Sequence, residues 1–186
     1  EVRTFNVQDL ELRMDGDNAT VVGYGAVFNS ESNDLGGFYE YISPGAFDGR
    51  LEDDVRFLIN HDGLPLARTT NGTLRLSVDE KGLRYEADLN TKVSTANDLM
   101  ELLKDGTISQ SSFAFTVEDD SWRSEDGKNI RTINKVSRLY DISSVTFPAY
   151  SQASSSVALR SMEEWQEKEE AKKLEVNLAK EKEEAQ

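Results

Sequence analysis

The sequence contains no cysteine and only one histidine in 186 residues. Without cysteine the chain has no disulfides, no thiolate zinc site and no cysteine nucleophile, and this composition is typical of a reducing cytosol. The sequence also lacks a glycine-rich phosphate loop and a group of histidines at metal-ligand spacing, so we expect neither a cofactor nor a metal. Any reaction that needs an imidazole base must therefore use His61.

Basic side chains are also scarce. The 21 Lys and Arg residues are outnumbered by 35 Asp and Glu residues, and the net charge of −14 with a pI of about 4.5 argues against nucleic acid as a direct partner. No apolar run approaches the roughly 20 residues of a membrane span and no signal-peptide pattern opens the chain, so we expect no membrane partner. The first residue is glutamate rather than methionine, which favours a start that is processed or trimmed.

A change of composition divides the chain into two parts. We expect residues 1–157 to form one domain and residues 158–186 to form a charged helical tail, because Glu, Lys and Ala predominate in the tail. In the tail, Glu164 and Lys168 have the i,i+4 spacing of a helical ion pair. The tail is either a solvated helix without a partner or a docking segment, and the sequence leaves both interpretations open.

The first part contains short alternating or apolar segments that predict strands, and an α+β fold with a mainly antiparallel sheet is expected. Glycines 23 and 25 predict a bulge or a close backbone approach within one strand. The predicted strands are residues 2–14, 19–28, 38–42, 55–60, 73–78, 82–89, 108–118, 130–136 and 139–147.

Two helices and one loop complete the expected first part. Residues 43–51 open with a Ser-Pro helix-start signal and predict a short helix. Residues 95–98 have the pattern of a capping box, and Gly106 marks the expected end of the helix that follows. Residues 119–129 are predicted to form a charged loop.

Three polar segments stand out from this pattern. Three serines lie at positions 109–112, directly before Phe113-Ala114-Phe115, although serine adds little to apolar burial and a buried hydroxyl needs a partner. His61 follows an apolar strand, and Asp141 lies within another. Each feature alone has an ordinary explanation, as a surface or core histidine, a strand with small residues, or an ion pair. We interpret the three segments as meeting in one site.

The chemistry of that site would be nucleophilic catalysis by serine. A serine hydroxyl becomes reactive when a histidine takes its proton and a carboxylate orients the histidine. Histidine has an unperturbed pKa near 6.5, which suits this role. The sequence has no Gly-x-Ser-x-Gly motif, so an α/β-hydrolase is disfavoured.

Ser111 and Ser112 are rival candidates for the nucleophile. Neighbouring residues of a strand face opposite sides, so Ser111 shares a face with Phe113 and Phe115. Ser112 shares the other face with the smaller Ala114. Because a cleft needs room, Ser112 is the preferred candidate.

Five stretches resemble, in order and approximate spacing, the prohead proteases of tailed bacteriophages, the HK97-like family. The resemblance covers about residues 23–157 and implies a serine endopeptidase with a β-barrel-like core flanked by a few helices, similar to herpesvirus assemblins. The stretches are Gly23-Tyr24-Gly25-Ala26-Val27-Phe28, Ile42-Ser43-Pro44-Gly45-Ala46-Phe47, Asn60-His61-Asp62, Ser111-Ser112-Phe113-Ala114-Phe115 and Leu139-Tyr140-Asp141-Ile142-Ser143-Ser144-Val145-Thr146-Phe147-Pro148-Ala149-Tyr150.

Carried over by this resemblance, His61 is the base, Ser112 is the nucleophile and Asp141 is the third member of a triad. In the assemblins the third member is a second histidine, which this chain does not contain, so a carboxylate closes the triad here. The family usually has glycine where this chain has Ala114, which restricts the backbone at that point.

The resemblance implies a capsid-maturation protease packed inside the procapsid in the host cytoplasm. Its expected partners are the major capsid protein and the scaffold region, and it is expected to cleave itself, with the chain ends as products. The resemblance is also compatible with a homodimer. The alternatives are a non-catalytic scaffold-type assembly protein on a protease fold and a binding module in which the three residues do not meet.

Overall fold

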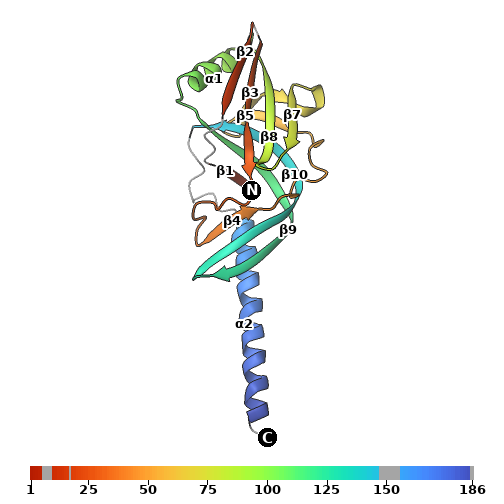
Figure 1. Ribbon diagram of the computed structural model, residues 1–186, viewed down its shortest axis with the longest axis vertical. Helices are drawn as coiled ribbons and strands as arrows, with labels where there is room; N and C mark the ends of the chain where they lie inside the picture. Colours follow the sequence, from red (N-terminus) through yellow and green to blue (C-terminus); the bar gives the residue numbers. More distant parts are fainter. Residues whose placement is uncertain (6–9, 17, 147–155, 185–186) are drawn as a thin grey trace. The chain divides into compact units, whose positions relative to one another are not determined.

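The computed structural model describes residues 1–5, 10–16, 18–146 and 156–184. The chain divides into two compact units, residues 1–153 and 154–186. The described residues of the first unit form two open sheets with one α-helix and one 3-10 turn, and those of the second form one long helix (Figure 1).

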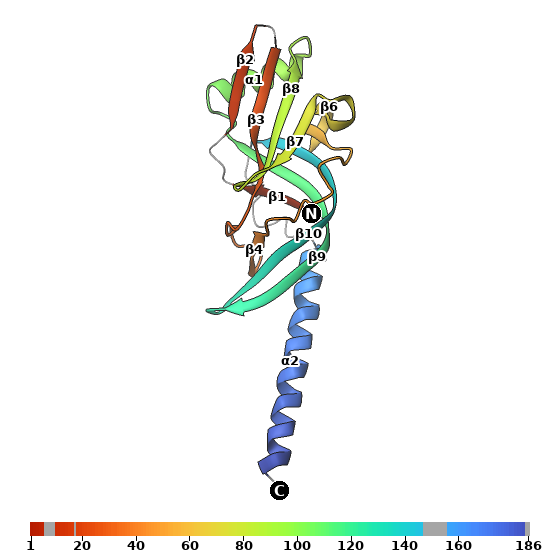
Figure 2. The same cartoon turned by 45° about the vertical axis from the view of Figure 1, so that its right-hand side comes forward.

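The first sheet has six strands and is built around the long strand β10. β10 pairs antiparallel with β9 along most of its length, and it pairs parallel with β4 near its start and with β5 near its end. β1 and β6 form the edges of the main path (Figure 2). The strands are β1 (Val2–Phe5), β4 (Phe38–Ile42), β5 (Arg56–Ile59), β6 (Asp62–Arg68), β9 (Gln110–Glu125) and β10 (Lys128–Val145).

The second sheet has four antiparallel strands in the order β2-β3-β8-β7. Along the chain, the helix α1 lies between β8 and β9 and ends at a left-handed glycine, Gly106, as predicted. The remaining elements are β2 (Glu11–Asp15), β3 (Asn18–Val27), β7 (Leu74–Val78), β8 (Gly82–Asn90), α1 (Ser94–Lys104) and the 3-10 turn η1 (Thr69–Asn71).

Aromatic side chains of the two sheets pack into one core. Phe113 and Phe115 of β9 stack with their ring centroids 4.5 Å apart, and Phe57 of β5 lies 5.5 Å from the ring of Tyr85 of β8. β3 passes close to β10 at Gly25, where a Cβ would lie 3.3 Å from Ile142, and the register of β3 shifts there. The bulge, one of the two predicted alternatives, is therefore confirmed, and the close contact at Gly25 is with a side chain.

Several predicted elements differ from the structure. Residues 119–129 are not a loop, because β9 and β10 continue as a two-stranded ribbon closed by a turn at Asp126 and Gly127, both with positive φ. Residues 2–14 are not one strand, since β1 and β2 belong to different sheets. β6, which was not predicted, pairs with β5.

The predicted short helix over residues 43–51 is also wrong. These residues form successive i→i+3 turns, and the positive φ angles of Gly45 (89°) and Gly49 (74°) interrupt a regular helix. The predicted capping box does not form either: Val93 is the N-cap residue of α1, and no side chain caps the helix.

The expectation of an α+β fold with mainly antiparallel strands is confirmed. Within the described residues both sheets are open, so the barrel-like core does not take the form of a closed barrel.

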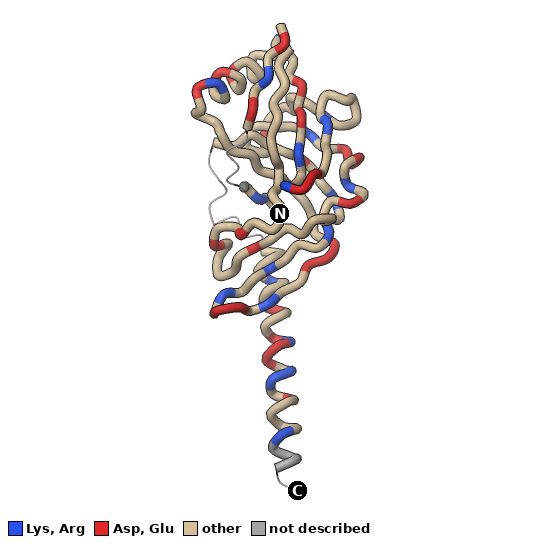
Figure 3. Tube along the Cα trace, viewed as in Figure 1, with Lys and Arg blue, Asp and Glu red and all other residues tan. Residues whose placement is uncertain are grey.

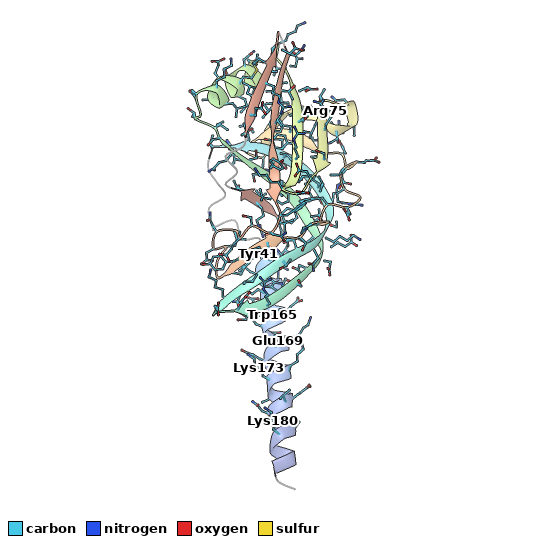
Figure 4. The ribbon with its side chains drawn as sticks, in the orientation of Figure 1. Tyr41, Arg75, Trp165, Glu169, Lys173 and Lys180 are labelled. Atoms are coloured by element: carbon cyan, nitrogen blue, oxygen red, sulfur yellow. The ribbon has the colours of Figure 1, made fainter. Side chains whose placement is uncertain are left out.

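The second unit contains the helix α2 (Ser156–Glu184), which confirms the prediction of a charged helical tail. Acidic and basic residues are interspersed along α2 (Figure 3). Its labelled side chains, among them Trp165, Lys173 and Lys180, extend outward along the helix (Figure 4). None of the helices in the described parts of the chain is long and apolar enough to cross a membrane.

Candidate active site

His61 lies in the two-residue turn that joins β5 to β6. Asn60 and His61 both have positive φ angles, 53° and 59°, which are typical of the tight turns that match the twist of a hairpin. Asparagine tolerates this conformation well, but it is uncommon for histidine. The side-chain carbonyl of Asn60 accepts hydrogen bonds from the backbone N–H and the hydroxyl of Thr146, at 2.9 and 3.1 Å. The turn is therefore fastened to the end of β10.

Ser112 and Asp141 are brought together by the pairing of β9 with β10. In this register Ser112 lies opposite Ser143, and Ala114 lies opposite Asp141. Residues that are directly opposite in an antiparallel pair share a face of the sheet, so these four side chains lie on one face. The residues between them, such as Phe113, point to the core.

The imidazole of His61 lies between the serine and the carboxylate. Nε2 is 2.7 Å from the Ser112 Oγ, and Nδ1 is 2.5 Å from the Asp141 Oδ1. An ionised carboxylate only accepts hydrogen bonds, so Nδ1 carries a proton and donates it to Asp141. In the neutral ring Nε2 is then an acceptor and can take the serine proton. The arrangement can therefore perform general-base activation of a serine.

The hydroxyl of Ser112 has a second acceptor. Its Oγ donates to the backbone carbonyl oxygen of Arg3 on β1, at 2.8 Å. Ser112 is fully buried, whereas the side chain of His61 is 18% exposed. In this structure β1 therefore lies against the candidate nucleophile and competes with the imidazole for its proton.

β1 is held in place by a buried group of charges, which we call the Arg3 cluster and define as Arg3, Glu40, Arg131, Asp120 and Glu1. Arg3 donates two hydrogen bonds to Glu40, at 2.7 and 3.0 Å. Arg131 also contacts Glu40, at 3.1 Å, and Asp120, at 2.6 Å. Burial lowers the pKa of the Arg131 guanidinium, but the bond that Arg131 donates to Glu1, at 2.8 Å, and the other acidic partners raise it overall. These charge-assisted bonds tie β1 to β4 and β10.

Ser111, the rival nucleophile, lies on the other face of β9. Its hydroxyl forms a 2.7 Å hydrogen bond with the phenol of Tyr85, and both side chains are buried. Burial raises the pKa of Tyr85 to about 12, so the phenol stays protonated near neutrality. The structure thus brings Ser112, and not Ser111, next to His61.

Two contacts of the site were missed by the sequence reasoning. Ser143 hydrogen-bonds to both Asp141 and the backbone of His61, and its position two residues after Asp141 on the same strand face could have indicated this. The carbonyl of Arg3 lies 109 residues from Ser112 in the sequence, and no sequence signal links the two. Among the described residues, no group of three or more His, Asp or Glu residues could hold a metal ion.

The model of one protein family, described as the Caudovirus prohead serine protease, matches residues 7–168. No curated protein and no solved structure matches the chain significantly. The matched range contains His61, Ser112 and Asp141 and covers most of the chain. The chain therefore belongs to the Caudovirus prohead serine protease family, whose members are serine proteases of phage capsid maturation.

Proposed function

We propose that this protease cleaves peptide bonds with a catalytic triad of Ser112, His61 and Asp141. The observation that supports the assignment most directly is the position of one imidazole within hydrogen-bond distance of both other side chains, 2.7 and 2.5 Å. The three residues are 51 and 80 positions apart along the chain, so local sequence does not force this contact.

In the proposed mechanism Ser112 Oγ attacks the scissile carbonyl carbon while Nε2 of His61 takes the hydroxyl proton. Asp141 accepts the hydrogen bond from Nδ1 and stabilises the imidazolium. The imidazolium then gives its proton to the leaving amine, and an acyl ester remains on Ser112. A water molecule, deprotonated by the same Nε2, hydrolyses this ester and restores the serine.

The proposed substrates are the N-terminal segment of the major capsid protein and the scaffold region, inside the procapsid. Self-cleavage is part of the same proposal. Family membership supports these substrates as a class. The helical tail is proposed as a docking segment for the coat shell.

Mass spectrometry of capsid-protein precursor incubated with the enzyme tests the assignment. Ser112→Ala is expected to lower cleavage on the order of 10⁶-fold, which is below detection. Ser111→Ala, one residue away on the core face, serves as the matched control and is expected to cleave normally. Normal cleavage by Ser112→Ala together with an inactive Ser111→Ala would overturn the assignment.

A fluorophosphonate, which reacts with activated serines, gives a second readout that needs no substrate. We expect it to label wild-type protein at Ser112. Failure to label, in the free protein and in procapsids alike, would favour a non-catalytic scaffold-type assembly protein instead.

A further inference from the structure

We propose that Ser143 is a positioning residue, whose hydroxyl fixes the carboxylate of Asp141 and the backbone of His61 relative to each other. The inference rests on the proposed triad. It concerns a side chain that lies beside the reacting serine and connects two of the groups that act on it.

The hydrogen bonds of Ser143 have a direction that follows from chemistry. Its Oγ lies 2.9 Å from the Asp141 Oδ1 and 3.1 Å from the backbone N of His61. An ionised carboxylate can only accept, and a backbone N–H can only donate. The hydroxyl therefore donates its single proton to Asp141 and accepts the N–H of His61. One oxygen atom thus bridges the base and its orienting carboxylate.

The hydrogen bond from the His61 N–H to Ser143 forms at a residue with an unfavourable backbone conformation. His61 adopts the left-handed conformation, with φ 59°, which is unfavourable for a non-glycine residue. The N–H of a strained turn needs a defined acceptor if the imidazole is to keep one orientation. Ser143 provides this acceptor. It also adds a second hydrogen bond to the same carboxylate oxygen that receives Nδ1–H, so this oxygen has little freedom to rotate away.

Burial of the hydroxyl supports the same conclusion. Ser143 is fully buried and lies directly opposite Ser112 in the β9–β10 register. A buried hydroxyl contributes less to packing than a methyl group, and its removal from water must be compensated by hydrogen bonds. All three polar contacts of the Ser143 hydroxyl go to the triad, since its Oγ also lies 3.3 Å from the Nδ1 of His61. The next residue, Ser144, is equally buried but lies on the opposite face of β10.

A matched pair of variants separates the hydroxyl from the volume of the side chain. Ser143→Thr keeps the hydroxyl, and Ser143→Val has nearly the same shape without it. The readout is the labelling of Ser112 by a fluorophosphonate, resolved into the maximal rate and the half-saturating concentration. We expect Ser143→Val to lower the maximal rate about 100-fold with little change in half-saturation, because small displacements of catalytic groups have effects of that order. Ser143→Thr should stay within about fivefold of wild type, as should the control Ser144→Ala.

A second readout does not depend on labelling. His61 is the only histidine of the chain, so the proton on its Nδ1 gives one downfield NMR resonance that needs no assignment by mutation. This resonance should persist in Ser143→Thr and should broaden or move upfield in Ser143→Val and Ser143→Ala. Ser143→Ala replaces Ser143→Val if valine prevents folding, which circular dichroism will reveal.

The outcomes separate this inference from the triad itself. If Ser143→Val and Ser143→Ala equal Ser143→Thr in labelling rate and in the Nδ1–H resonance, Ser143 is not a positioning residue. If Ser112→Ala is inactive in that case, the triad stands and only the role of Ser143 is lost. If Ser112→Ala remains active, the proposed triad fails first.

Discussion

The backbone carbonyl oxygen of Arg3 lies 2.8 Å from the hydroxyl oxygen of Ser112, which is itself 2.7 Å from the Nε2 of His61. A hydroxyl has one proton, so only one of these acceptors can take it at a time. When the proton points to Arg3, the serine is not activated. We therefore expect movement of β1 to precede reaction at Ser112.

Arg3→Lys tests this expectation, because lysine keeps the charge but cannot form the two parallel bonds that Arg3 makes with Glu40. Each 1.4 kcal/mol of weakened anchoring should raise the population of open β1, and with it the labelling rate, about tenfold. Fluorophosphonate labelling measures the rate, and amide exchange of β1 measures the opening. Arg13→Lys, at an exposed ion pair with Glu11, is the control. Faster exchange without faster labelling would show that β1 does not limit access.

Asp141→Asn should abolish activation while leaving the fold intact. An amide can donate to Nδ1, which moves the imidazole proton to Nε2, and a protonated Nε2 cannot accept from Ser112. We expect the labelling rate to fall about 10⁴-fold. Asp98→Asn, on the exposed face of α1, should label as wild type does. A decrease of less than tenfold for Asp141→Asn would argue against its orienting role.

Because the phenol of Tyr85 is buried, we expect the folded protein to lose stability at alkaline pH. Burial raises its pKa to about 12 from an ordinary value near 10, so the unfolded chain ionises this phenol before the folded protein does. The stabilisation from the neutral phenol is complete below pH 10 and is lost as the pH rises toward 12, by about 3 kcal/mol at most. Urea unfolding at pH 8 to 12 measures this slope. Tyr85→Phe should reduce it, and an unchanged slope in that variant would assign the alkaline loss to other groups.

Two variants of the turn residue Asn60 separate the effect of backbone strain on stability from the effect of its hydrogen bonds. Asn60→Gly removes the bonds to Thr146 but accepts positive φ freely, so we expect a loss of about 1 kcal/mol in the free energy of unfolding. Asn60→Ala loses the same bonds and is strained as well, which should cost about 1 kcal/mol more. Urea unfolding of both variants gives the comparison. Equal stabilities would show that the turn relaxes to negative φ.

Sequence patterns predicted the parts of the fold that have an apolar side. Strands β4 and β8 and the helix α1 bury residues at the expected spacing, and the strands β5 and β7 each bury one large apolar side chain. The sequence predicts a loop for residues 119–129 because both faces of this ribbon are largely exposed and polar. No apolar alternation therefore indicates strands there. The sequence predicts a helix over residues 43–51 because Ser-Pro is a local helix-start signal. The left-handed conformations of two glycines, which prevent a regular helix there, depend on the surrounding structure.

The candidate site was predicted from a resemblance supported by strand alternation. Alternation put Ser112 on the small-residue face, and the structure has it there beside His61. Neither the position of His61 beside Asp141 nor the contact of β1 with Ser112 could be derived, because they depend on pairing between distant segments, β5 with β10 and β1 with β9. Such pairing follows from tertiary packing, and sequence propensity carries little information about it.

The place of β10 in the order of the chain also bears on when the proposed site can be complete. Asp141 and Ser143 lie near the end of that strand, after every other strand that the structure describes in residues 1–153. A chain still on the ribosome therefore lacks the orienting carboxylate until almost the whole of residues 1–153 has emerged. In the proposed mechanism, chains truncated before β10 are therefore expected to show no reaction at Ser112.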